Sequence, residues 1–438
     1  MSSCLTGLLR LAVLFVYYGA THGSEKFLFN ERLISSHELG TGGDTGKTEL
    51  HNENIPLDKK IELYRENIPL DKTSDSEDSF PVVCYLSIGN NFTGPIPPQA
   101  NVTLCSHIIL LGTGIQNAEM APSVYSQIYC KSVSAMKKLN PNLKVLLSNG
   151  GDFGSVLISA ENRTRFANSM IPYLTNYTLD GFDLDWEFPA WPIGKEHPPQ
   201  QQHNYSLLLQ TIRETLDDYS VKMNRSKFLL TAAVASTTPL IYSCYEIPEL
   251  AKYLDFVNVM TYDIHGFGPT TPFTGFNSPM HSGKTILDRT IFLNYNLVSA
   301  AEEWVKGGMS KKQVVIGIPA YGHTFELLDK NLHGVYSLAV GINKTLGDEI
   351  NYDIICGLLK NGYTEVWDEV GEVPYAYADK SWVSYDNEKS VAIKAKWIKS
   401  NGYGGVMTYS LSVDDYMGKC NGIKWPLHVA IHNALNET

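Results

Sequence analysis

The sequence predicts an α/β fold, a closed (β/α)8 TIM barrel with a small α+β insertion domain after the seventh strand. From Phe80 onward, eight short apolar runs alternate with amphipathic helical stretches, which is typical of parallel strands joined by helices. One run, residues 180–189, alternates carboxylates with apolar side chains in the period of a strand. The regular spacing breaks once, between Ile318 and Gly405. A doubly wound open sheet is the alternative, but it usually has fewer strands.

The predicted elements follow one another in short, regular steps. The eight strands are expected at 82–87, 107–111, 144–148, 180–189, 228–234, 256–262, 314–318 and 405–409. The helices are expected at 123–138, 161–174, 205–223, 286–306 and 425–435. In the third of these helices, for example, Leu208, Ile212 and Leu216 recur at helical spacing.

The break in spacing predicts the insertion, at roughly 325–384. Short runs that contain aromatic residues, at 366–368, 374–377 and 382–385, are separated by turn residues and are more typical of strands than of helices. Loops of a barrel stand over the carboxyl ends of its strands, so an insertion there can wall a cleft. The main domain is expected to span 80–435.

The first 79 residues differ from the rest. Arg10 precedes an apolar run at 11–18, and small residues follow, which indicates a secretory signal peptide at 1–23. A retained membrane anchor is the alternative, but the run is short for a membrane span. Residues 24–79 are polar and repeat E-N-I-P-L-D-K at 53–59 and 66–72. We expect this segment to be a disordered leader, since it offers little apolar surface to bury.

Composition narrows the class of partner. The 438-residue chain has a net charge of −11, so nucleic acid is not expected as a partner, whereas a neutral polysaccharide is compatible. Once Cys4 leaves with the signal peptide, six cysteines remain, enough for three disulfides in an oxidising compartment. N-glycosylation sequons support secretion; they begin at Asn91, Asn101, Asn162, Asn176, Asn204, Asn224, Asn343 and Asn436.

The run D-G-F-D-L-D-W-E-F-P at 180–189 carries the chemistry. On one strand, Asp183, Asp185 and Glu187 share a face, and the opposite face is wholly apolar. An ordinary half-exposed strand is the plain alternative. Three neighbouring acids repel, however, so at least one pKa should rise. A carboxyl that stays protonated near neutral pH is what a general acid requires.

This run, D-x-x-D-x-D-x-E, closely resembles the motif of glycoside hydrolase family 18, the chitinases and chitinase-like lectins. The resemblance covers about 80–435 and extends to S-N-G-G at 148–151, M-T-Y-D at 260–263, G-I-P-A-Y-G at 317–322 and G-G-V-M at 404–407. The stretch from 352 through the aromatic runs resembles the family's insertion domain. The expected partner is therefore an N-acetylglucosamine polysaccharide or oligosaccharide, with no cofactor and no metal, bound by a secreted monomer.

The resemblance implies a role for each acid. Glu187 is the general acid that protonates the glycosidic oxygen, and the substrate's own N-acetyl carbonyl acts as the nucleophile. Asp185 orients the acetamido N–H, and Asp183 shares a proton with Asp185. Tyr262 donates its hydroxyl to the acetamido oxygen.

The resemblance also implies a sugar site and two disulfides. The substrate-binding residues are Tyr85, Gly151, Met260, Asp263, Tyr321 and Tyr409. The barrel core is an alternative place for Met260 and Met407, and Asp180 is expected to be structural. The implied disulfides are Cys84–Cys105 and Cys356–Cys420, while Cys130 and Cys244 either pair or are free.

Several places where the family grips sugar rings differ in this chain. The family's aromatic positions correspond to Gly89, Gly112, Asp152, Gly268 and, in place of a tryptophan, Tyr409, and its arginine corresponds to His323. Three hypotheses remain: a hydrolase with an altered cleft, a lectin-like protein with negligible turnover, and an interaction protein on a barrel scaffold. The retained acid favours the first, and the missing aromatic side chains favour the other two.

Overall fold

A computed structural model describes residues 80–86, 101–191 and 200–437. The predicted signal peptide at 1–23, the polar leader at 24–79, Gly89 and the sequon at Asn91 lie outside the described residues.

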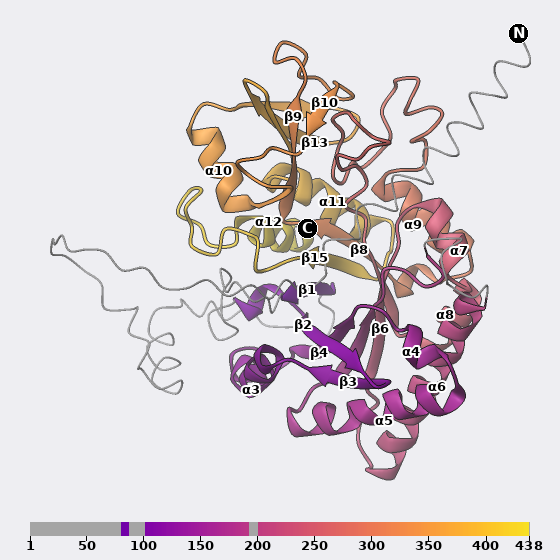
Figure 1. Ribbon diagram of the computed structural model, residues 1–438. Helices are drawn as coiled ribbons and strands as arrows, with labels where there is room; N and C mark the ends of the chain where they lie inside the picture. Colours follow the sequence, from indigo (N-terminus) through magenta and orange to yellow (C-terminus); the bar gives the residue numbers. More distant parts are fainter. Residues whose placement is uncertain (1–79, 87–100, 192–199, 438) are drawn as a thin grey trace, which may run out of the picture.

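Eight parallel strands form the barrel (Figure 1). In order they are β1 (Val82–Leu86), β2 (His107–Gln116), β4 (Lys144–Gly150), β5 (Gly181–Asp185), β6 (Leu229–Val234), β7 (Phe256–Val259), β8 (Val314–Pro319) and β15 (Gly405–Tyr409). The ring closes where β15 pairs in parallel with β1, which places Val406 opposite Val82. A short antiparallel strand, β3 (Glu119–Pro122), forms a hairpin with β2. The predicted fold class is confirmed.

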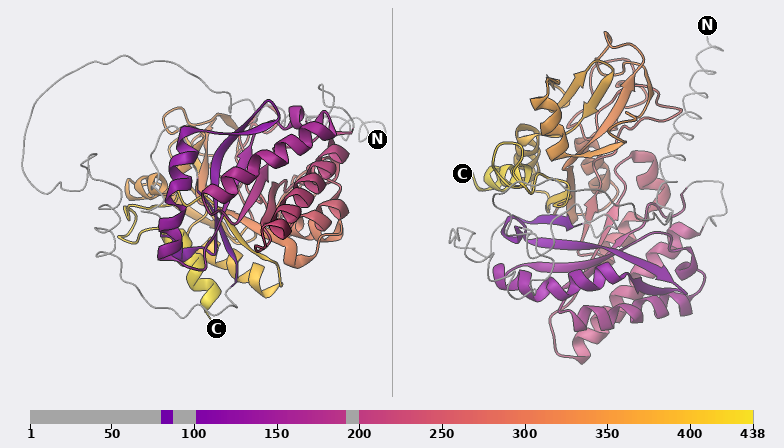
Figure 2. Two further views of the ribbon diagram at one scale, coloured as in Figure 1. Left: turned by 90° about the horizontal axis from the view of Figure 1, so that it is seen from below. Right: turned by 60° about the vertical axis from the view of Figure 1, so that its left-hand side comes forward.

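The helices lie around the outside of the barrel (Figures 1 and 2). They are α3 (Val124–Leu139), α4 (Gly154–Leu157), α5 (Ala160–Asn176), α6 (Gln201–Lys222), α7 (Thr238–Cys244), α8 (Ile247–Tyr253), α9 (Leu297–Lys306), α11 (Glu388–Ser400) and α12 (Pro426–Asn436), with short 3-10 helices at Val102–Leu104 and Lys311–Gln313. The strands bury their outward side chains against these helices. On β5, Phe182 and Leu184 belong to this outer core, so the alternation directs Asp183 into the barrel.

A second, antiparallel sheet stands over the barrel (Figure 2). It consists of β9 (Tyr321–Leu327), β10 (Ala339–Gly341), β11 (Glu349–Asn351), β12 (Thr364–Asp368), β13 (Val373–Ala378) and β14 (Ser381–Ser384), with helix α10 (Tyr352–Lys360). Its own core contains Phe325, Tyr375 and Trp382. Because β9 begins directly after β8, this insertion rises from the carboxyl ends of the barrel strands.

Two disulfides are present, and both match the pairs implied by the resemblance. Cys84–Cys105 joins β1 to the segment before β2, and Cys356–Cys420 joins α10 to the loop between β15 and α12. Cys130 and Cys244 are buried free thiols, which settles the alternative that the sequence left open.

The helix predicted at 286–306 is wrong in its first half, since only Leu297–Lys306 is helical. The Asp288 carboxylate accepts hydrogen bonds from the backbone N–H and the hydroxyl of Thr285. The Asn296 side chain caps α9 by accepting a hydrogen bond from Ser299 N–H at 2.9 Å. Such side-chain bonds to the backbone compete with helix formation and fix where the helix begins.

Two predicted strands end early. β5 ends at Asp185 and β7 ends at Val259, so residues 186–188 and 260–262 leave the sheet. Glu187 and Tyr262 therefore lie on loops that continue from the carboxyl ends of the strands, where barrels place their reactive groups.

A buried ion pair anchors the loop that follows β7. Lys394 Nζ of α11 lies 2.6 Å from Asp386 Oδ1, and both side chains are almost fully buried. The same ammonium group donates to the carbonyl of Ser278 at 2.5 Å and to its hydroxyl at 2.9 Å. Removal of the lysine would leave an uncompensated buried carboxylate.

We expect Lys394→Met to lower the free energy of unfolding by about 3–5 kcal/mol, measured by urea denaturation. The matched control is Lys330→Met, which breaks the exposed pair with Asp379 and should change stability by about 0–1 kcal/mol. Equal effects of the two substitutions would contradict the anchoring role of the buried pair.

Candidate active site

Asp183 is the buried centre of the site. Its Oδ2 accepts hydrogen bonds from the hydroxyls of Tyr85 at 3.0 Å and Ser148 at 2.8 Å. Its Oδ1 accepts from Thr231 at 2.5 Å and Asn258 at 3.4 Å. Burial raises the pKa of Asp183, and these donors from β1, β4, β6 and β7 partly oppose that rise.

Asp185 is the last residue of β5, one step nearer the opening. Burial raises its pKa well above the usual value, and the neighbouring charges of Glu187 and Asp183 raise it further. Its Oδ1 is buried and has no hydrogen-bond partner among the described residues. A buried carboxyl oxygen without a partner is costly, and here it is available to a proton or to a ligand donor.

Glu187 lies beyond the end of the strand, and its side chain is exposed at the opening. Protein nevertheless surrounds it closely enough that lost hydration is the largest cause raising its pKa to about 7, followed by the charges of Asp263 and Glu349. One side of the Glu187 side chain therefore faces solvent, whereas its other sides lie against protein and are poorly hydrated. A carboxyl with this pKa can deliver a proton near neutral pH.

Four tyrosines line the inner mouth of the barrel. The Tyr409 ring centroid lies 6.0 Å from that of Tyr85, 5.8 Å from that of Tyr262 and 6.0 Å from that of Tyr321. The Tyr262 hydroxyl lies 3.7 Å from the sulfur of Met407. Met407 is fully buried, as expected of a core residue. Met260 is partly buried and packs against the same inner cluster.

Asp263 faces the acids from the loop after β7. Its backbone has a φ of 54°, a left-handed conformation held by a 2.8 Å hydrogen bond from its N–H to Asn277 Oδ1. Its carboxylate accepts a hydrogen bond from the Tyr321 hydroxyl and lies 2.7 Å from His323 Nε2. His323 Nδ1 lies 3.2 Å from Asp348.

His323 is a buried cation in this network. Burial lowers its pKa, but its bonds to Asp263 and Asp348 outweigh burial and raise the pKa to about 10. It therefore partly offsets the negative charge that Asp263 presents to Glu187.

The structure gathers the sequence-predicted site residues at one end of the barrel. Besides those above, Gly151 lies just past the end of β4 with a φ of 100°. A Cβ at Gly151 would meet no atom of the described residues within 4 Å, but the positive φ would strain any side chain there. Asp180 lies at the opposite end of β5 and accepts a hydrogen bond from Val145 N–H at 2.7 Å, in line with its expected structural role.

Sequence reasoning missed four members of the site: Thr231, Asn258, Asn277 and Asp348. Two of them carried a signal, because Thr231 and Asn258 are single polar residues at inward positions of otherwise apolar strands. Asn277 and Asp348 lie in loops, and no pattern in the sequence places them beside Asp263 and His323.

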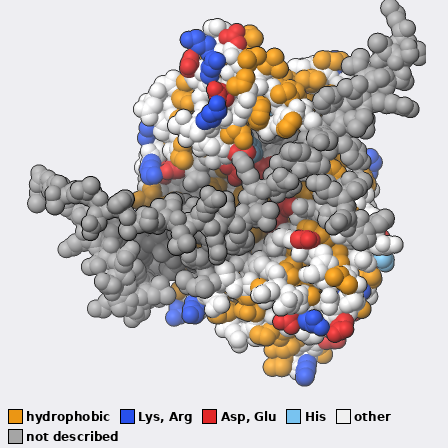
Figure 3. Space-filling view, viewed as in Figure 1, with side chains coloured by type: hydrophobic (Ala, Val, Ile, Leu, Met, Phe, Trp, Pro, Cys, Tyr) orange, Lys and Arg blue, Asp and Glu red, His pale blue; other side chains and the backbone are white. Residues whose placement is uncertain are grey.

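On the surface, acidic side chains show in the middle of one face, between the part formed by the barrel and the part formed by the insertion (Figure 3).

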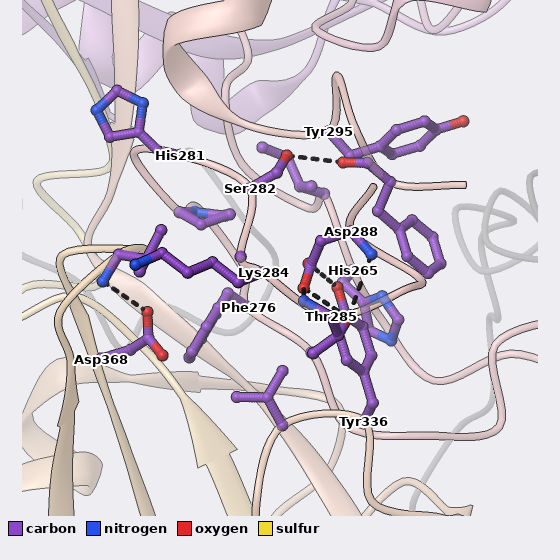
Figure 4. A pocket seen from close by; sticks show the side chains of 17 residues that line it. His265, Phe276, His281, Ser282, Lys284, Thr285, Asp288, Tyr295, Tyr336 and Asp368 are labelled. Carbon is purple, nitrogen blue, oxygen red and sulfur yellow. Dashed lines mark hydrogen bonds between the residues drawn. The ribbon is translucent and has the colours of Figure 1, made fainter. Parts of the chain in front are cut away.

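A separate cavity of about 240 Å³ lies between the loop after β7 and the insertion (Figure 4). It contains none of the three acids. Burial acts to raise the pKa of its buried Asp288, but hydrogen bonds from Thr285, Tyr336 and Gly283 outweigh burial and lower it. Burial lowers the pKa of His265 to about 4. Neither group is a proton donor at neutral pH, so this cavity offers no general acid.

No group of three or more His, Cys, Asp or Glu side chains within 80–86, 101–191 and 200–437 could hold a metal ion. No helix in that part of the chain is long and apolar enough to cross a membrane.

Comparisons with known proteins agree with this geometry. A family described as glycosyl hydrolases family 18 matches residues 81–414. The chain is 30% identical to Chitotriosidase-1 of Mus musculus over 372 residues, which cover 81% of this chain and 78% of that protein.

Two solved structures are also similar to this chain. An immunomodulatory active chitinase from Trichuris suis, TsES1, is 31% identical, with a TM-score of 0.75 over 82% of this chain and 100% of the other. Human YKL-39, described as a pseudo-chitinase with retained chitooligosaccharide binding properties, is 30% identical, with a TM-score of 0.75 over 82% of this chain and 100% of its own.

The raised pKa of Glu187 predicts a pH-dependent stability. Its pKa is about 7 in the folded protein against an ordinary value of 4.5, so the folded state binds the proton more tightly than the unfolded chain. This group therefore lowers the free energy of unfolding as pH rises from 4.5 through 7. Glu187→Gln should match the wild type near pH 4 and be the more stable protein near pH 8, as thermal melts would show.

The neighbours of Glu187 supply the control for that measurement. Asp263→Asn removes a charge that raises the pKa and should shrink the difference between Glu187→Gln and its parent. His323→Gln removes the offsetting cation and should enlarge it. If the Tm difference between Glu187→Gln and its parent stays constant with pH in the wild-type, Asp263→Asn and His323→Gln proteins, the Glu187 pKa is not raised.

Proposed function

The chain belongs to family 18 of the glycosyl hydrolases, and on that basis we propose that it is a secreted, retaining glycosidase. Its substrate would be a chain of N-acetylglucosamine joined by β-1,4 linkages, as in chitin or chitooligosaccharides. The observation that carries this proposal is the row of carboxyls formed by Asp183, Asp185 and Glu187, which runs from the barrel interior to its opening. The surroundings of the outermost carboxyl, Glu187, raise its pKa to about 7.

In the proposed reaction, Glu187 gives its proton to the glycosidic oxygen while the bond to the anomeric carbon breaks. The carbonyl oxygen of the substrate's own N-acetyl group forms the new bond to that carbon, which gives an oxazolinium-like intermediate. The ionised Glu187 then takes a proton from the water that opens this intermediate, so configuration is retained. An intramolecular nucleophile has a high effective molarity and replaces the second carboxylate of most glycosidases.

Asp185 is suited to orient that nucleophile. Its Oδ1 has no partner among the described residues, so the acetamido N–H of a bound sugar could donate to it. The proton that Asp185 releases or receives would be shared with Asp183, as expected of two neighbouring carboxyls that titrate together. Tyr262, at the same mouth, would donate its hydroxyl to the acetamido oxygen in place of its present contact with Met407.

The remaining sugar-site assignments are part of the same proposal. Tyr85, Gly151, Met260, Asp263, Tyr321 and Tyr409 would line the site of the reacting sugar. The apolar run at 11–18 and the N-x-S/T sequons support secretion, and a neutral glycan is compatible with a net charge of −11. No cofactor or metal enters the scheme, and a monomer suffices for it.

A lectin-like protein with little turnover is the second candidate. It is favoured by the smaller or polar residues at the family's aromatic positions, including Asp152, Gly268 and Tyr409. Human YKL-39 shows that a similar chain can bind chitooligosaccharides as a pseudo-chitinase. An interaction protein on a barrel scaffold remains the third candidate, although it would give no role to an intact array of acids.

The first test is hydrolysis of fluorogenic di- and tri-N-acetylchitooligosaccharides by the secreted protein. Glu187→Gln should reduce turnover by about 10²–10⁴-fold, the usual contribution of a general acid, without loss of the fold by circular dichroism. Glu119→Gln, on strand β3, is the matched control and should leave turnover unchanged. Turnover that survives Glu187→Gln would refute the assignment, and binding without turnover in the wild type would favour the lectin.

The second test concerns the floor of the site. Tyr409→Trp should tighten binding of a chitooligosaccharide by roughly fivefold, about 1 kcal/mol, because a larger ring offers more stacking surface. The measurement is titration calorimetry in the Glu187→Gln background, where the ligand would stay intact. An unchanged dissociation constant would count against Tyr409 as the floor of the sugar site.

A further inference from the structure

A surface groove lies on the side of the barrel away from the insertion, between helix α5 and strand β3. Its volume is about 490 Å³, within the range of about 300–1,000 Å³ typical of small-ligand sites. It is lined by Met120 from β3 and by Pro172, Tyr173, Asn176 and Tyr177 at the end of α5. The two walls are tied together, since Met120 N–H donates to Ser169 Oγ of α5 at 2.9 Å.

Asn176 in this groove begins a sequon, Asn176-Tyr177-Thr178. Helix α5 ends at Asn176, and Thr178 beyond it has a φ of 53°, so the chain turns away from the helix here. The Asn176 and Thr178 side chains are exposed. The amide of Asn176 makes no hydrogen bond within the described part of the chain, so it is available to carry a sugar.

Other sequons are less suited to a glycan in the folded protein. The Asn343 amide donates to Ser381 Oγ at 2.8 Å, and its oxygen accepts from the backbone of Thr345 and Leu346. The sequon at Asn204 ends in Ser206, which is only 3% exposed. Asn224 is exposed but does not line the groove, which makes it a matched control.

We propose that Asn176 carries an N-linked glycan whose first N-acetylglucosamine lies in this groove against the ring of Tyr173. The two side chains are three residues apart on one helix and therefore share a face. The Tyr173 ring is half-buried, packing with one part against the core. Its remaining surface can stack on the apolar face of a pyranose, while Gln127 and Glu119 at the rim offer polar partners.

The attached sugar would cover apolar surface that the groove otherwise leaves to water. A covalently held sugar needs only a weak affinity to occupy the groove, because its effective concentration there is high. The sugar would therefore stabilise the contact between α5 and the β2–β3 hairpin. The inference rests on the proposed secretion, since N-linked glycans are added in the secretory route, but it does not depend on hydrolytic activity.

The test begins with the full chain expressed with its own leader in cultured animal cells that keep glycans in the high-mannose form. Glycopeptide mass spectrometry of protein from the medium and from the cells should show a glycan on Asn176. Endoglycosidase H, which leaves one N-acetylglucosamine on the asparagine, should leave Tm unchanged, because the sugar in the groove remains. Asn176→Gln should lower Tm by on the order of 2 °C, whereas Asn224→Gln should not.

Tyr173→Ala distinguishes a sugar that packs against the groove from a glycan that is attached to Asn176 without contacting it. In that background, Asn176→Gln should no longer lower Tm, because the stacking surface is gone. Protein in the medium with an unmodified Asn176 would overturn this inference and leave the proposed secretion standing. Protein absent from the medium and unmodified in the cells would overturn both, and equal Tm changes for Asn176→Gln and Asn224→Gln would overturn the groove contact.

Discussion

The buried carboxyl of Asp183 is the constraint around which the barrel interior is arranged. A carboxylate without partners inside a protein is strongly unfavourable, so each neighbouring strand that faces it contributes a polar group. Ser148, Thr231 and Asn258 reach it from β4, β6 and β7, and the hydroxyl of Tyr85 reaches it from β1 across the interior. Only a closed ring of strands brings these groups to one point, so fold and site depend on the same closure.

The other two acids, Asp185 and Glu187, lie progressively nearer the opening of the barrel than Asp183. The pleat of β5 places Asp185 two residues further along the same face, where one carboxyl oxygen lacks a partner among the described residues. The strand then ends, and Glu187 rises into the opening between barrel and insertion. There burial is the main cause that raises its pKa, followed by the charges of Asp263 and Glu349. His323 partly offsets the charge of Asp263. Burial thus raises the pKa of all three acids, Asp183, Asp185 and Glu187, but the neighbouring groups that modify each pKa differ.

Much of this arrangement was predictable from the sequence, because alternation along 180–189 fixes which side chains face inward. The end of β5 was not, since residues 186–188 keep the alternation although the backbone has left the sheet. The first half of the helix predicted at 286–306 is not helical, because the side chains of Asp288 and Asn296 bond to the local backbone instead. The pair of His323 and Asp348, which lie 25 residues apart, depends on the antiparallel pairing of β9 with β11, which places Glu349 opposite His323. Local patterns do not encode which strands pair.

In the proposed function, proton chemistry and sugar binding would come from different parts of this fold, which accounts for intact acids beside altered aromatic positions. The acids depend on the barrel interior, where a change at one position would leave a buried carboxyl unsatisfied. In that proposal most stacking positions would lie on loops past the strand ends, as at Asp152 after β4, an exposed residue whose side chain could change without repacking the core. Tyr409 is the exception, because it ends strand β15 and contacts three other tyrosines. If the proposed sugar site is right, a smaller ring there would alter the floor beneath the reacting sugar, so Tyr409 would bear on its orientation toward Glu187 as well as on affinity.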